Sequence, residues 1–358
     1  MKKVLILINN LYGGGAQRVV SRLSNALAGS VDVVIMTFSM ENSYSLSDRI
    51  RHYCFKEPDL LTGYKGILGT VVYVFRHYTA LCRQLIDVKE REHPDTVISF
   101  LSKPNLLNAL TRTRGCRTVM SERNNPKKKG AKYYLQGLFS YLLADRIVFQ
   151  SRTIMKMFPW IVRRKGVVVP NPVRADCMAV GGSHRIVTMG RLKPQKNHQL
   201  LIKAFALFAE SHPQYSLYIY GRGYERDEVG YSALIEQLSL SGRVFLEGHK
   251  TEVHKEIATA EQFVLSSNFE GEPNALLEAM MMGLPCISTR FEGADELFKD
   301  SDACLLTDMG NEKELAEAMT RMADDEGCRR GYALRGQAFA KAFSLEKVIP
   351  LWHKALFE

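Results

Sequence analysis

The chain has 358 residues, 46% of them hydrophobic and 24% charged, which excludes a disordered protein and predicts two domains or three. Its net charge of +10 is unevenly divided. Residues 1–175 hold 28 Lys and Arg against 11 Asp and Glu, whereas residues 176–358 hold 20 against 27. The basic half suits an anionic partner, such as nucleic acid, an acidic membrane leaflet or a phosphorylated acceptor, although solvated faces that merely differ in charge would give the same numbers.

The cysteines and the apolar runs indicate the compartment. The seven cysteines are scattered without a Cys-x-x-Cys pair, which argues against structural zinc and disulfides and favours a reducing cytoplasm. The first apolar run, Val4 to Ile8, is too short for a secretory signal and predicts a buried strand. No stretch approaches the ~18 apolar residues of a membrane span. We therefore expect a cytoplasmic protein that meets a membrane only peripherally.

The first half alternates strands and helices. An apolar run at 2–8 is followed by a glycine loop, an amphipathic pattern that ends at Gly29, and a second apolar run at 31–38. This strand-loop-helix-strand unit is typical of a doubly wound parallel sheet. Further strands are predicted at 95–100, 117–122, 146–151 and 166–171. Most of them end in polar residues, at the edge where such sheets bind ligands.

The alternation begins again after residues 172–183, whose turn-forming composition predicts a linker. Strands are predicted at 184–192, 215–223, 243–248, 262–267 and 285–290, with helices at 197–213, 231–242, 252–260 and 274–283. We expect an α/β fold of two doubly wound, Rossmann-like domains that face one another across a cleft. The first domain is 1–172, joined by a C-terminal helix at 345–358, and the second is 184–344. Segment 344–358 is expected to pack back across both domains, with Trp352 in a buried contact rather than a functional one.

The loop GRLKPQKN, residues 190–197, follows the first predicted strand of the second domain. Arg191 and Lys196 lie five residues apart, just before a predicted helix. A guanidinium, an ammonium and free helix N–H groups can there meet one anion, as phosphate binding requires. Two solvated loop cations are the alternative. The next strand ends near Gly221, where a glycine lets a ligand approach the backbone closely.

The stretch NFEGEPNALLEAM places two carboxylates eight residues apart, Glu270 in a loop and Glu278 inside a predicted helix. Gly271 suits the turn, and Pro273 suits the first helical turn. Carboxylates accept from sugar or ribose hydroxyls, and helix-start amides favour a phosphate. The amides concerned belong to Asn274, Ala275 and Leu276. The sequence predicts a site for a phosphorylated sugar, with an ordinary loop acid and a solvated helix glutamate as the alternative.

Together these motifs resemble the retaining glycosyltransferases of the GT-B fold, in particular family 4, the group that builds bacterial polysaccharides and lipid-linked oligosaccharides. The resemblance covers nearly the whole chain. The matching segments are GGGAQR (13–18) for G-G-A-E-R, SER (121–123) for S-E-H, PNP (170–172) for N-P, GRLKPQKN for G-R-L-x-x-x-K-N, NFEGEPNALLEAM for E-G-x-P-x-x-x-L-E-A, and FEGADEL (291–297) for G-G-x-x-E. The E-x7-E pair within its E-G-x-P context is the most specific of these.

The resemblance implies a role for each matching residue. Arg191 and Lys196 would neutralise the donor diphosphate, Glu270 would contact hydroxyls of the donor sugar, and Glu278 would hold the nucleotide ribose. The donor's own phosphate would take the acceptor's proton, so no enzymic nucleophile, cofactor or metal is expected. Other implied donor-binding residues are Gly14, Gly15, Asn171, Gly190, Gly221 and Gly271, beside the amides of Asn274, Ala275 and Leu276. The expected substrates are a nucleotide sugar, most simply UDP-linked with a hexose or N-acetylhexosamine, and a lipid-linked saccharide of surface polysaccharide (O-antigen, capsule or exopolysaccharide) or glycoprotein glycan assembly.

The chain departs from the family at Arg123, where many relatives have histidine, so a histidine role cannot be carried over. Gln17 and Glu292 also replace a usual glutamate and glycine. The acceptor-binding candidates are Glu122, Arg123, Lys127 and Lys128. The basic loop 124–134 suits an anionic acceptor or lipid headgroups at the inner face of the cell membrane, or is simply solvated. Residues 60–85 suit either an interfacial helix or an ordinary core helix.

Three other functions are alternatives to sugar transfer. A sugar-nucleotide epimerase would keep the nucleotide site but needs acid-base residues in the first domain, where no persuasive set is found. A dehydrogenase fits poorly, because GGGAQR is not G-x-G-x-x-G and Asp32 does not end a strand. A nucleic-acid-binding protein would explain the basic half, but no recognition motif is present there, and no nucleic acid partner is expected.

Overall fold

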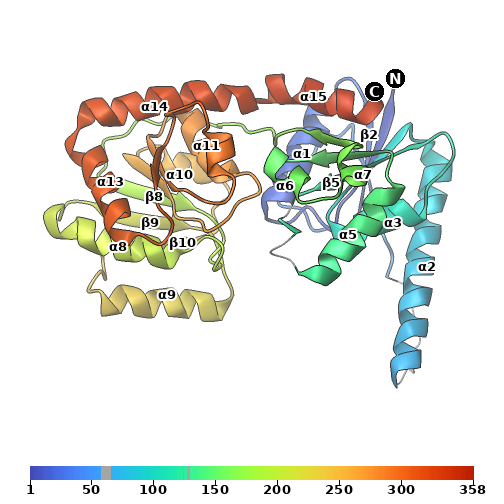
Figure 1. Cartoon of the computed structure of the whole chain (residues 1–358), viewed down its shortest axis with the longest axis horizontal. Coiled ribbons are helices and arrows are strands. Elements are labelled where there is room, and N and C mark those ends of the chain that lie inside the picture. Colours follow the sequence, from blue (N-terminus) through green and yellow to red (C-terminus); the bar gives the residue numbers. More distant parts are fainter. Residues whose placement is uncertain (58–65, 124, 127–129) are drawn as a thin grey trace. The chain divides into compact units, whose positions relative to one another are not determined.

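The computed structural model describes residues 1–57, 66–123, 125–126 and 130–358, apart from the side chains of 67 and 68 (Figure 1). The chain divides into two compact units. Unit 1 comprises residues 1–172 and 345–358, and unit 2 comprises residues 173–344. Each unit contains a parallel sheet with helices on both faces, so the prediction of two doubly wound α/β units is confirmed.

In the described part of unit 1, seven parallel strands form a sheet in the order β3-β2-β1-β4-β5-β6-β7. Their bounds are β1 Lys3–Leu7, β2 Asp32–Thr37, β3 Arg51–Cys54, β4 Thr96–Phe100, β5 Arg117–Glu122, β6 Arg146–Phe149 and β7 Gly166–Val168. Every predicted strand is present, and β3 is an additional one. The order reverses between β1 and β4, and such a reversal is where doubly wound sheets bind ligands.

The helices of unit 1 bury both faces of this sheet. Their bounds are α1 Gly15–Leu27, α2 Gly66–Glu92, α3 Ser102–Leu110, α5 Ala131–Leu143, α6 Arg152–Lys156, α7 Trp160–Arg163 and α15 Leu345–Phe357. Alternate residues of β1 enter two different clusters: Val4 and Ile6 pack with residues of α1 and α15, and Leu5 and Leu7 pack with residues of α2 and α3. This alternation explains why the strand reads as an unbroken apolar run.

Helix α2 divides into an exposed and a buried part. Leu81 and Leu85 are fully buried in the core of unit 1, whereas Val71 and Phe75 are 58% and 70% exposed. The buried turns fit the core-helix interpretation of residues 60–85, whereas the interfacial interpretation of the exposed turns stays a prediction. Residues 60–65 lie outside the described part.

The C-terminal helix α15 belongs to the core of unit 1. Trp352 is fully buried, its ring centroid lies 5.9 Å from that of Phe100, and its Nε1 donates to the carbonyl of Pro170 at 3.3 Å. Thr96 Oγ1 also donates to the carbonyl of Leu356 at 2.9 Å. The prediction that Trp352 packs rather than acts is consistent with this position.

In the described part of unit 2, six parallel strands run in the order β10-β9-β8-β11-β12-β13. Their bounds are β8 Arg185–Met189, β9 Ser216–Tyr220, β10 Val244–Gly248, β11 Gln262–Leu265, β12 Cys286–Thr289 and β13 Leu305–Thr307. The helices are α8 His198–Ser211, α9 Glu225–Gln237, α10 Val253–Ile257, α11 Asn274–Met282, α12 Ala294–Leu297, α13 Glu312–Asp324 and α14 Glu326–Ala340, followed by a 3-10 turn at Lys341–Phe343. The order of this sheet reverses between β8 and β11.

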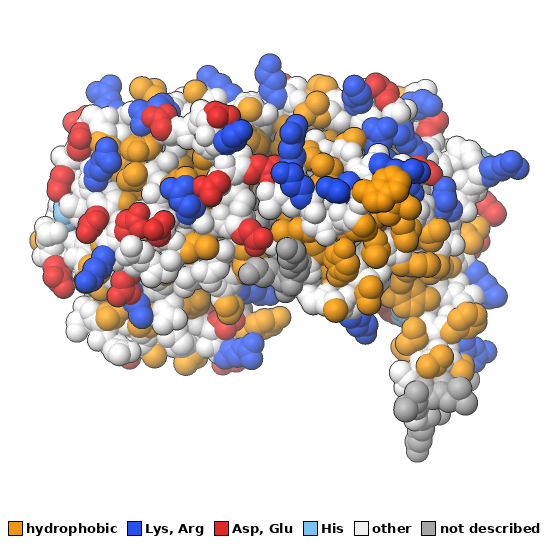
Figure 2. All heavy atoms as spheres, viewed as in Figure 1, with side chains coloured by type: hydrophobic (Ala, Val, Ile, Leu, Met, Phe, Trp, Pro, Cys, Tyr) orange, Lys and Arg blue, Asp and Glu red, His pale blue; other side chains and the backbone are white. Residues whose placement is uncertain are grey.

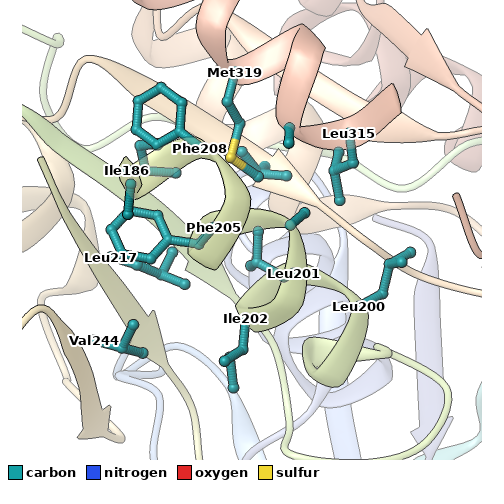
Figure 3. Close-up of a cluster of buried hydrophobic side chains, with 14 of the residues drawn as sticks. Ile186, Leu200, Leu201, Ile202, Phe205, Phe208, Leu217, Val244, Leu315 and Met319 are labelled. Carbon is teal, nitrogen blue, oxygen red and sulfur yellow. The ribbon is translucent and has the colours of Figure 1, made fainter. Parts of the chain in front are cut away.

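Two apolar clusters hold the sheet of unit 2 between its helices. On one face, Phe205 and Phe208 of α8 pack against Leu217 of β9 and Met319 of α13 (Figure 3). On the other face, α11 buries Leu276, Leu277 and Met280 together with residues of β11 and β12. This packing on both faces of the sheet holds β8 and β11 in place. The loops that follow these two strands form the candidate site.

Residues 173–183 are an ordered part of unit 2 rather than the separate linker expected from their composition. Val173 is buried, and its amide donates to the carbonyl of Phe343 at 2.9 Å. The amides of Ala179 and Val180 donate to the carbonyls of Met282 at 2.8 Å and Ala258 at 2.7 Å. Turn-forming composition indicates the lack of a helix or strand here but does not reveal these backbone bonds.

Candidate functional site

The ends of β8 and β9 approach one another closely because of two glycines. The amide of Gly190 donates to the carbonyl of Tyr220 at 2.9 Å. Gly221 has φ +147°, and a Cβ at that position would lie 2.0 Å from the carbonyl oxygen of Gly190. No side chain fits there, so the glycine that the sequence singled out is required by the fold itself.

Lys196 reaches across Gly190 toward a carboxylate. A Cβ at position 190 would lie 3.1 Å from Cδ and Cε of Lys196, so the missing side chain leaves room for the lysine stem. Lys196 Nζ lies 2.7 Å from Glu270 Oε1. The two side chains are 17% and 6% exposed. The loop after β8 and the loop after β11 are thus joined by a largely buried, charge-assisted hydrogen bond.

Further donors orient the Glu270 carboxylate. Ser267 Oγ donates to Oε1 at 2.6 Å, and Gln195 Nε2 donates to Oε2 at 3.4 Å and to the carbonyl of Phe269 at 2.9 Å. A buried carboxylate is costly unless it is paired and hydrogen-bonded, and this one is both. Glu270 is therefore held in one orientation as an acceptor, which suits recognition of a hydroxyl.

The two loops are also tied together by their backbones. The amide of Asn268 donates to the carbonyl of Gln195 at 2.9 Å, and Asn268 Nδ2 donates to the carbonyl of Pro194 at 3.0 Å. Asn197 caps α8, since its Oδ1 accepts from the amide of Leu200 at 3.4 Å. Sequence reasoning missed Gln195, Ser267 and Asn268, although the polar run Ser-Ser-Asn directly after a buried strand was an available signal.

Helix α11 begins beside Glu270, and the amide of its first residue, Asn274, donates to the carbonyl of Glu272 at 3.0 Å. Its N-terminal neighbour Pro273 provides no side-chain cap among the described residues, and the amide of Leu277 donates to the Pro273 carbonyl at 3.0 Å. The amides of Ala275 and Leu276 precede this first helical bond, in a helix of nine residues. The start of a helix carries partial positive charge and favours anions. Gly271 and Asn274, both half-buried, lie in the same turn.

Two further predicted donor-site residues, Arg191 and Glu278, differ in exposure. Arg191 is exposed, in the same loop as Lys196. Glu278 is fully buried, and its Oε2 lies 3.2 Å from Nε2 of His254. Nδ1 of the same histidine lies 2.9 Å from Oδ2 of Asp176. A ribose contact at Glu278 would require a carboxylate oxygen to become accessible, so that role stays a prediction. His254 itself carried no sequence signal.

In unit 1, the predicted acceptor residues Glu122 and Arg123 are buried, at 1% and 8% exposed. The Glu122 carboxylate accepts from the hydroxyls of Tyr133 at 3.0 Å and Tyr141 at 2.8 Å. Such burial leaves Glu122 little surface for an acceptor. Lys127 and Lys128 lie outside the described residues.

The guanidinium of Arg123 is packed inside unit 1. Its Nη1 donates to Oδ1 of Asn171 at 2.7 Å, and its Cζ lies 4.9 Å from the ring centroid of Trp352 and 5.5 Å from that of Phe100. Asn171 is 1% exposed. Arg123 and Asn171 are therefore hydrogen-bonded to each other. The acceptor contact of Arg123 and the donor contact of Asn171 stay predictions.

Gly14 and Gly15 lie at the start of α1 in unit 1. Gly14 has φ +93°, and a Cβ there would lie 2.7 Å from Oε1 of Gln17. Nε2 of Gln17 donates to Oδ1 of Asn10 at 3.3 Å. The glycine loop is thus braced by Gln17, the residue that replaces the usual glutamate, and its approach to donor phosphates stays a prediction.

Comparison with known proteins shows that the chain is similar to glycosyltransferases. Residues 178–338 match the family model described as "Glycosyl transferases group 1". A Campylobacter jejuni protein, N-acetylgalactosamine-N,N'-diacetylbacillosaminyl-diphospho-undecaprenol 4-alpha-N-acetylgalactosaminyltransferase, is 29% identical over 97% of both chains. Another from the same bacterium, GalNAc-alpha-(1->4)-GalNAc-alpha-(1->3)-diNAcBac-PP-undecaprenol alpha-1,4-N-acetyl-D-galactosaminyltransferase, is 26% identical over 100% of this chain and 99% of its own. The solved structure of HepE from Anabaena in complex with UDP and glucose aligns with a TM-score of 0.81 at 17% identity, over 99% of both chains.

The fold is that of the GT-B glycosyltransferases, and the chain is a glycosyltransferase. The match to the family model of glycosyl transferases group 1 covers the Lys196 and Glu270 loops. No described helix is long and apolar enough to cross a membrane.

Proposed function

We propose that the chain transfers a hexose or N-acetylhexosamine from a UDP-linked donor to a lipid-linked saccharide, with retention of the anomeric configuration. The observation that carries this proposal is the Lys196–Glu270 pair, 2.7 Å apart beside the start of α11. It combines a cation, an oriented carboxylate and helix-start amides in one pair of loops. A sugar diphosphate needs these three groups.

The proposed roles follow from charge. Lys196, with exposed Arg191 in the same loop, neutralises the diphosphate as it leaves. The α11 amides of Ala275 and Leu276 donate to phosphate oxygens. Glu270 accepts from a hydroxyl of the donor sugar and so positions the anomeric carbon. A phosphate oxygen of the donor takes the proton of the attacking acceptor hydroxyl, the carbon–oxygen bond to the diphosphate breaks, and the new glycosidic bond forms on the same face.

The substrate assignment rests on the relatives. Two of them are named for undecaprenol-linked acceptors, and the aligned structure of HepE was solved with UDP and glucose. We propose a lipid-linked acceptor of surface polysaccharide or glycoprotein glycan assembly, met at the inner face of the cell membrane. The basic first half of the chain supports this location.

Transfer is further proposed to need no metal ion or cofactor, since Lys196 and Arg191 can supply the positive charge that a divalent cation would otherwise bring. Activity that survives treatment with EDTA supports this point, and activity that is lost with EDTA and restored by Mg²⁺ or Mn²⁺ contradicts it.

The experiment that tests the function is a donor screen that follows release of UDP from several UDP-sugars, with a membrane extract as acceptor source and mass analysis of the lipid-linked product. Acceptor-dependent release with a mass gain of one sugar supports transfer. Conversion of a UDP-sugar to its epimer without any acceptor would instead establish the epimerase alternative.

A further inference from the structure

We infer that His254 is a positioning residue for the donor, because it orients the Glu278 carboxylate toward a ribose hydroxyl of the nucleotide. Asp176 in turn holds the ring of His254. The inference rests on the proposed function, since the ribose belongs to the nucleotide-sugar donor. It goes beyond that function by naming the two side chains through which the site distinguishes ribose from deoxyribose.

Glu278 lies at the level where a ribose follows the diphosphate. It comes four residues after Asn274, the first residue of α11, and three after Ala275, whose amide is proposed to bind phosphate. Residues spaced by three or four lie on the same side of a helix, about one turn or ~5.4 Å apart along its axis. In a nucleotide the ribose is joined directly to the first phosphate. A diphosphate at the start of α11 therefore brings the ribose toward Glu278.

The carboxylate of Glu278 is held by His254. Glu278 is fully buried, and its Oε2 lies 3.2 Å from Nε2 of His254, which is 3% exposed. The oxygens of an ionised carboxylate only accept hydrogen bonds, so this contact requires a proton on Nε2. The bond fixes the direction of one oxygen and with it the plane of the carboxylate. Recognition of a single hydroxyl needs a group that its neighbours hold in this way.

Asp176 contacts the other nitrogen of the ring with both a donor and an acceptor. Its amide donates to Nδ1 of His254 at 3.3 Å, and its Oδ2 lies 2.9 Å from the same atom. When Nδ1 accepts from the amide, the ring proton is on Nε2. When Nδ1 is protonated as well, it donates to Oδ2 and Nε2 is still a donor. In both states the ring keeps the proton that Glu278 requires.

The segment 173–183 places Asp176 beside the ring. Two amides of this segment donate to the carbonyls of the last residue of α11 and of the residue that follows α10. The segment is thus bonded to the two helices that carry Glu278 and His254. The side chain of Asp176 is 55% exposed, and its Oδ1 lies 3.4 Å from Nε of Arg174. Such an exposed carboxylate contributes little to stability, so its contact with the ring serves orientation.

Burial distinguishes the contact between Glu278 and His254 from most charges of unit 2. Figure 2 shows acidic and basic side chains mixed over the surface of unit 2, where ion pairs contribute little. Glu278 and His254 are both buried, and the cost of removing such groups from water offsets most of what their attraction contributes to stability. A role in holding a ligand accounts for their position better than a role in folding.

Unit 2 offers a matched control in a second buried histidine. His212 is 6% exposed, and its Nε2 lies 3.0 Å from Oδ1 of Asp324. His212 precedes β9, at the edge of the sheet where the strands begin, whereas His254 follows β10, at the edge where they end. Substitution of His212 therefore removes a buried histidine–carboxylate contact without touching the candidate site.

The test measures the dissociation constants (Kd) of UDP, 2′-deoxy-UDP and 3′-deoxy-UDP for the intact protein by calorimetric titration. We expect UDP to bind roughly tenfold or more tightly than at least one deoxy nucleotide, which lacks a hydroxyl that donates to a charged group. His254→Leu should remove this selectivity, mainly by weakening UDP. His254→Gln, whose amide still donates toward Glu278, should keep most of it. Full ribose selectivity in folded His254→Leu would overturn the inference.

Two further variants decide the matter if His254→Leu does not fold. Asp176→Ala, at a half-exposed position, should lower the selectivity roughly threefold, because only the amide then holds the ring. His212→Leu should lower the thermal unfolding midpoint and leave the selectivity unchanged. Undiminished selectivity in Asp176→Ala, or an equal loss in His212→Leu, would show that His254 does not position the carboxylate.

Kinetics adds a readout that a purely structural role would not give. With the UDP-linked donor, Asp176→Ala and His254→Leu should raise KM more than they lower kcat, since the ribose is remote from the reacting carbon. Equal kcat losses with an unchanged KM would contradict a ribose contact.

Binding separates this inference from the proposed function. A chain that binds UDP with ribose selectivity but transfers no sugar would contradict the proposed function and leave the assignment of His254 in place. Sugar transfer without any selectivity for the ribose hydroxyls would do the reverse. If another nucleoside diphosphate binds in place of UDP, its deoxy forms give the same comparison, since all of them contain ribose.

Discussion

Lys196 and Glu270 form a charge-assisted hydrogen bond of 2.7 Å that joins the loop after β8 to the loop after β11. The two residues are 74 positions apart in the sequence, and each belongs to a motif predicted independently to contact the donor. Their pairing places the positive charge that would meet a diphosphate next to the carboxylate that would accept from a sugar hydroxyl. A change to either residue is therefore expected to disturb the other.

We expect Glu270→Gln and Lys196→Ala each to lower kcat by a factor of roughly 10²–10³, since each removes an electrostatic contact to the reacting donor. Lys193→Ala is the matched control, because this lysine of the same loop lies over the ring of Tyr224 at 5.3 Å. Initial rates of UDP release measure the effect. Near-normal turnover of either site variant would remove the assignment.

The close approach of Gly190 and Gly221 predicts a large effect on folding. Gly221→Ala should lower the free energy of unfolding by at least about 2 kcal/mol, because the new Cβ would collide with the Gly190 carbonyl. Gly230→Ala in α9, where a Cβ meets nothing within 4 Å, should instead stabilise the protein by about 0.5–1 kcal/mol. Urea unfolding compares the two variants. Equal stabilities would show that the strand ends are not packed as described.

Stability should depend on pH through His198, the first residue of α8. Burial, assisted by the charge of Lys196, lowers the pKa of His198 to about 4. In the unfolded chain the pKa is near 6.5, so between these values only the unfolded state gains the proton. Stability is complete above pH ~6.5 and falls as the pH drops toward ~4, by on the order of 3 kcal/mol.

Urea unfolding between pH 4 and 7 measures this dependence, with His198→Gln as the variant that cannot titrate. The variant should lose that part of the acid sensitivity. Identical pH profiles of the unfolding free energy for both proteins would contradict the account of His198.

Substitution of Arg123 is expected to lower the stability of the fold rather than to remove a group that takes part in catalysis. Arg123→Ala should lower the free energy of unfolding by roughly 2–4 kcal/mol, because it removes the 2.7 Å bond to Asn171 and the packing on Trp352. Arg123→His, which introduces the histidine that many members of the resembled family have at this position, should also have a lower free energy of unfolding. Arg164→Ala, beside exposed Trp160, is the control. A variant at Arg123 that unfolds normally but loses acceptor affinity would restore the predicted acceptor role.

The strands were predictable because both faces of each sheet are buried, so an element such as β1 reads as continuous apolar sequence. Strand β3, at the edge of its sheet with half-buried and exposed residues, lacks that pattern and was missed. The helix at residue 274 was predictable from the turn and proline before it, which are local signals.

The partners of the predicted site residues could not be read from sequence. Ser267 is adjacent to the motif of Glu270 but is identified only by its 2.6 Å bond to that carboxylate. His254 sits beside Glu278 because α10 and α11 pack in one cluster, which no local pattern encodes. Arg123 was predicted to bind the acceptor, but it is buried and packs against Trp352 from the far end of the chain. Motifs predict which loops meet, whereas side-chain burial depends on packing between distant segments.

The most direct test of the central claim is the anomeric proton NMR spectrum of the product formed from a UDP-linked donor by the unaltered chain and by Glu270→Gln. The account predicts a product with the same anomeric configuration as the donor, and no detectable product from the variant over the same period. An inverted anomeric configuration, or equal product from the Glu270→Gln variant, would contradict retaining transfer at the Lys196 and Glu270 site.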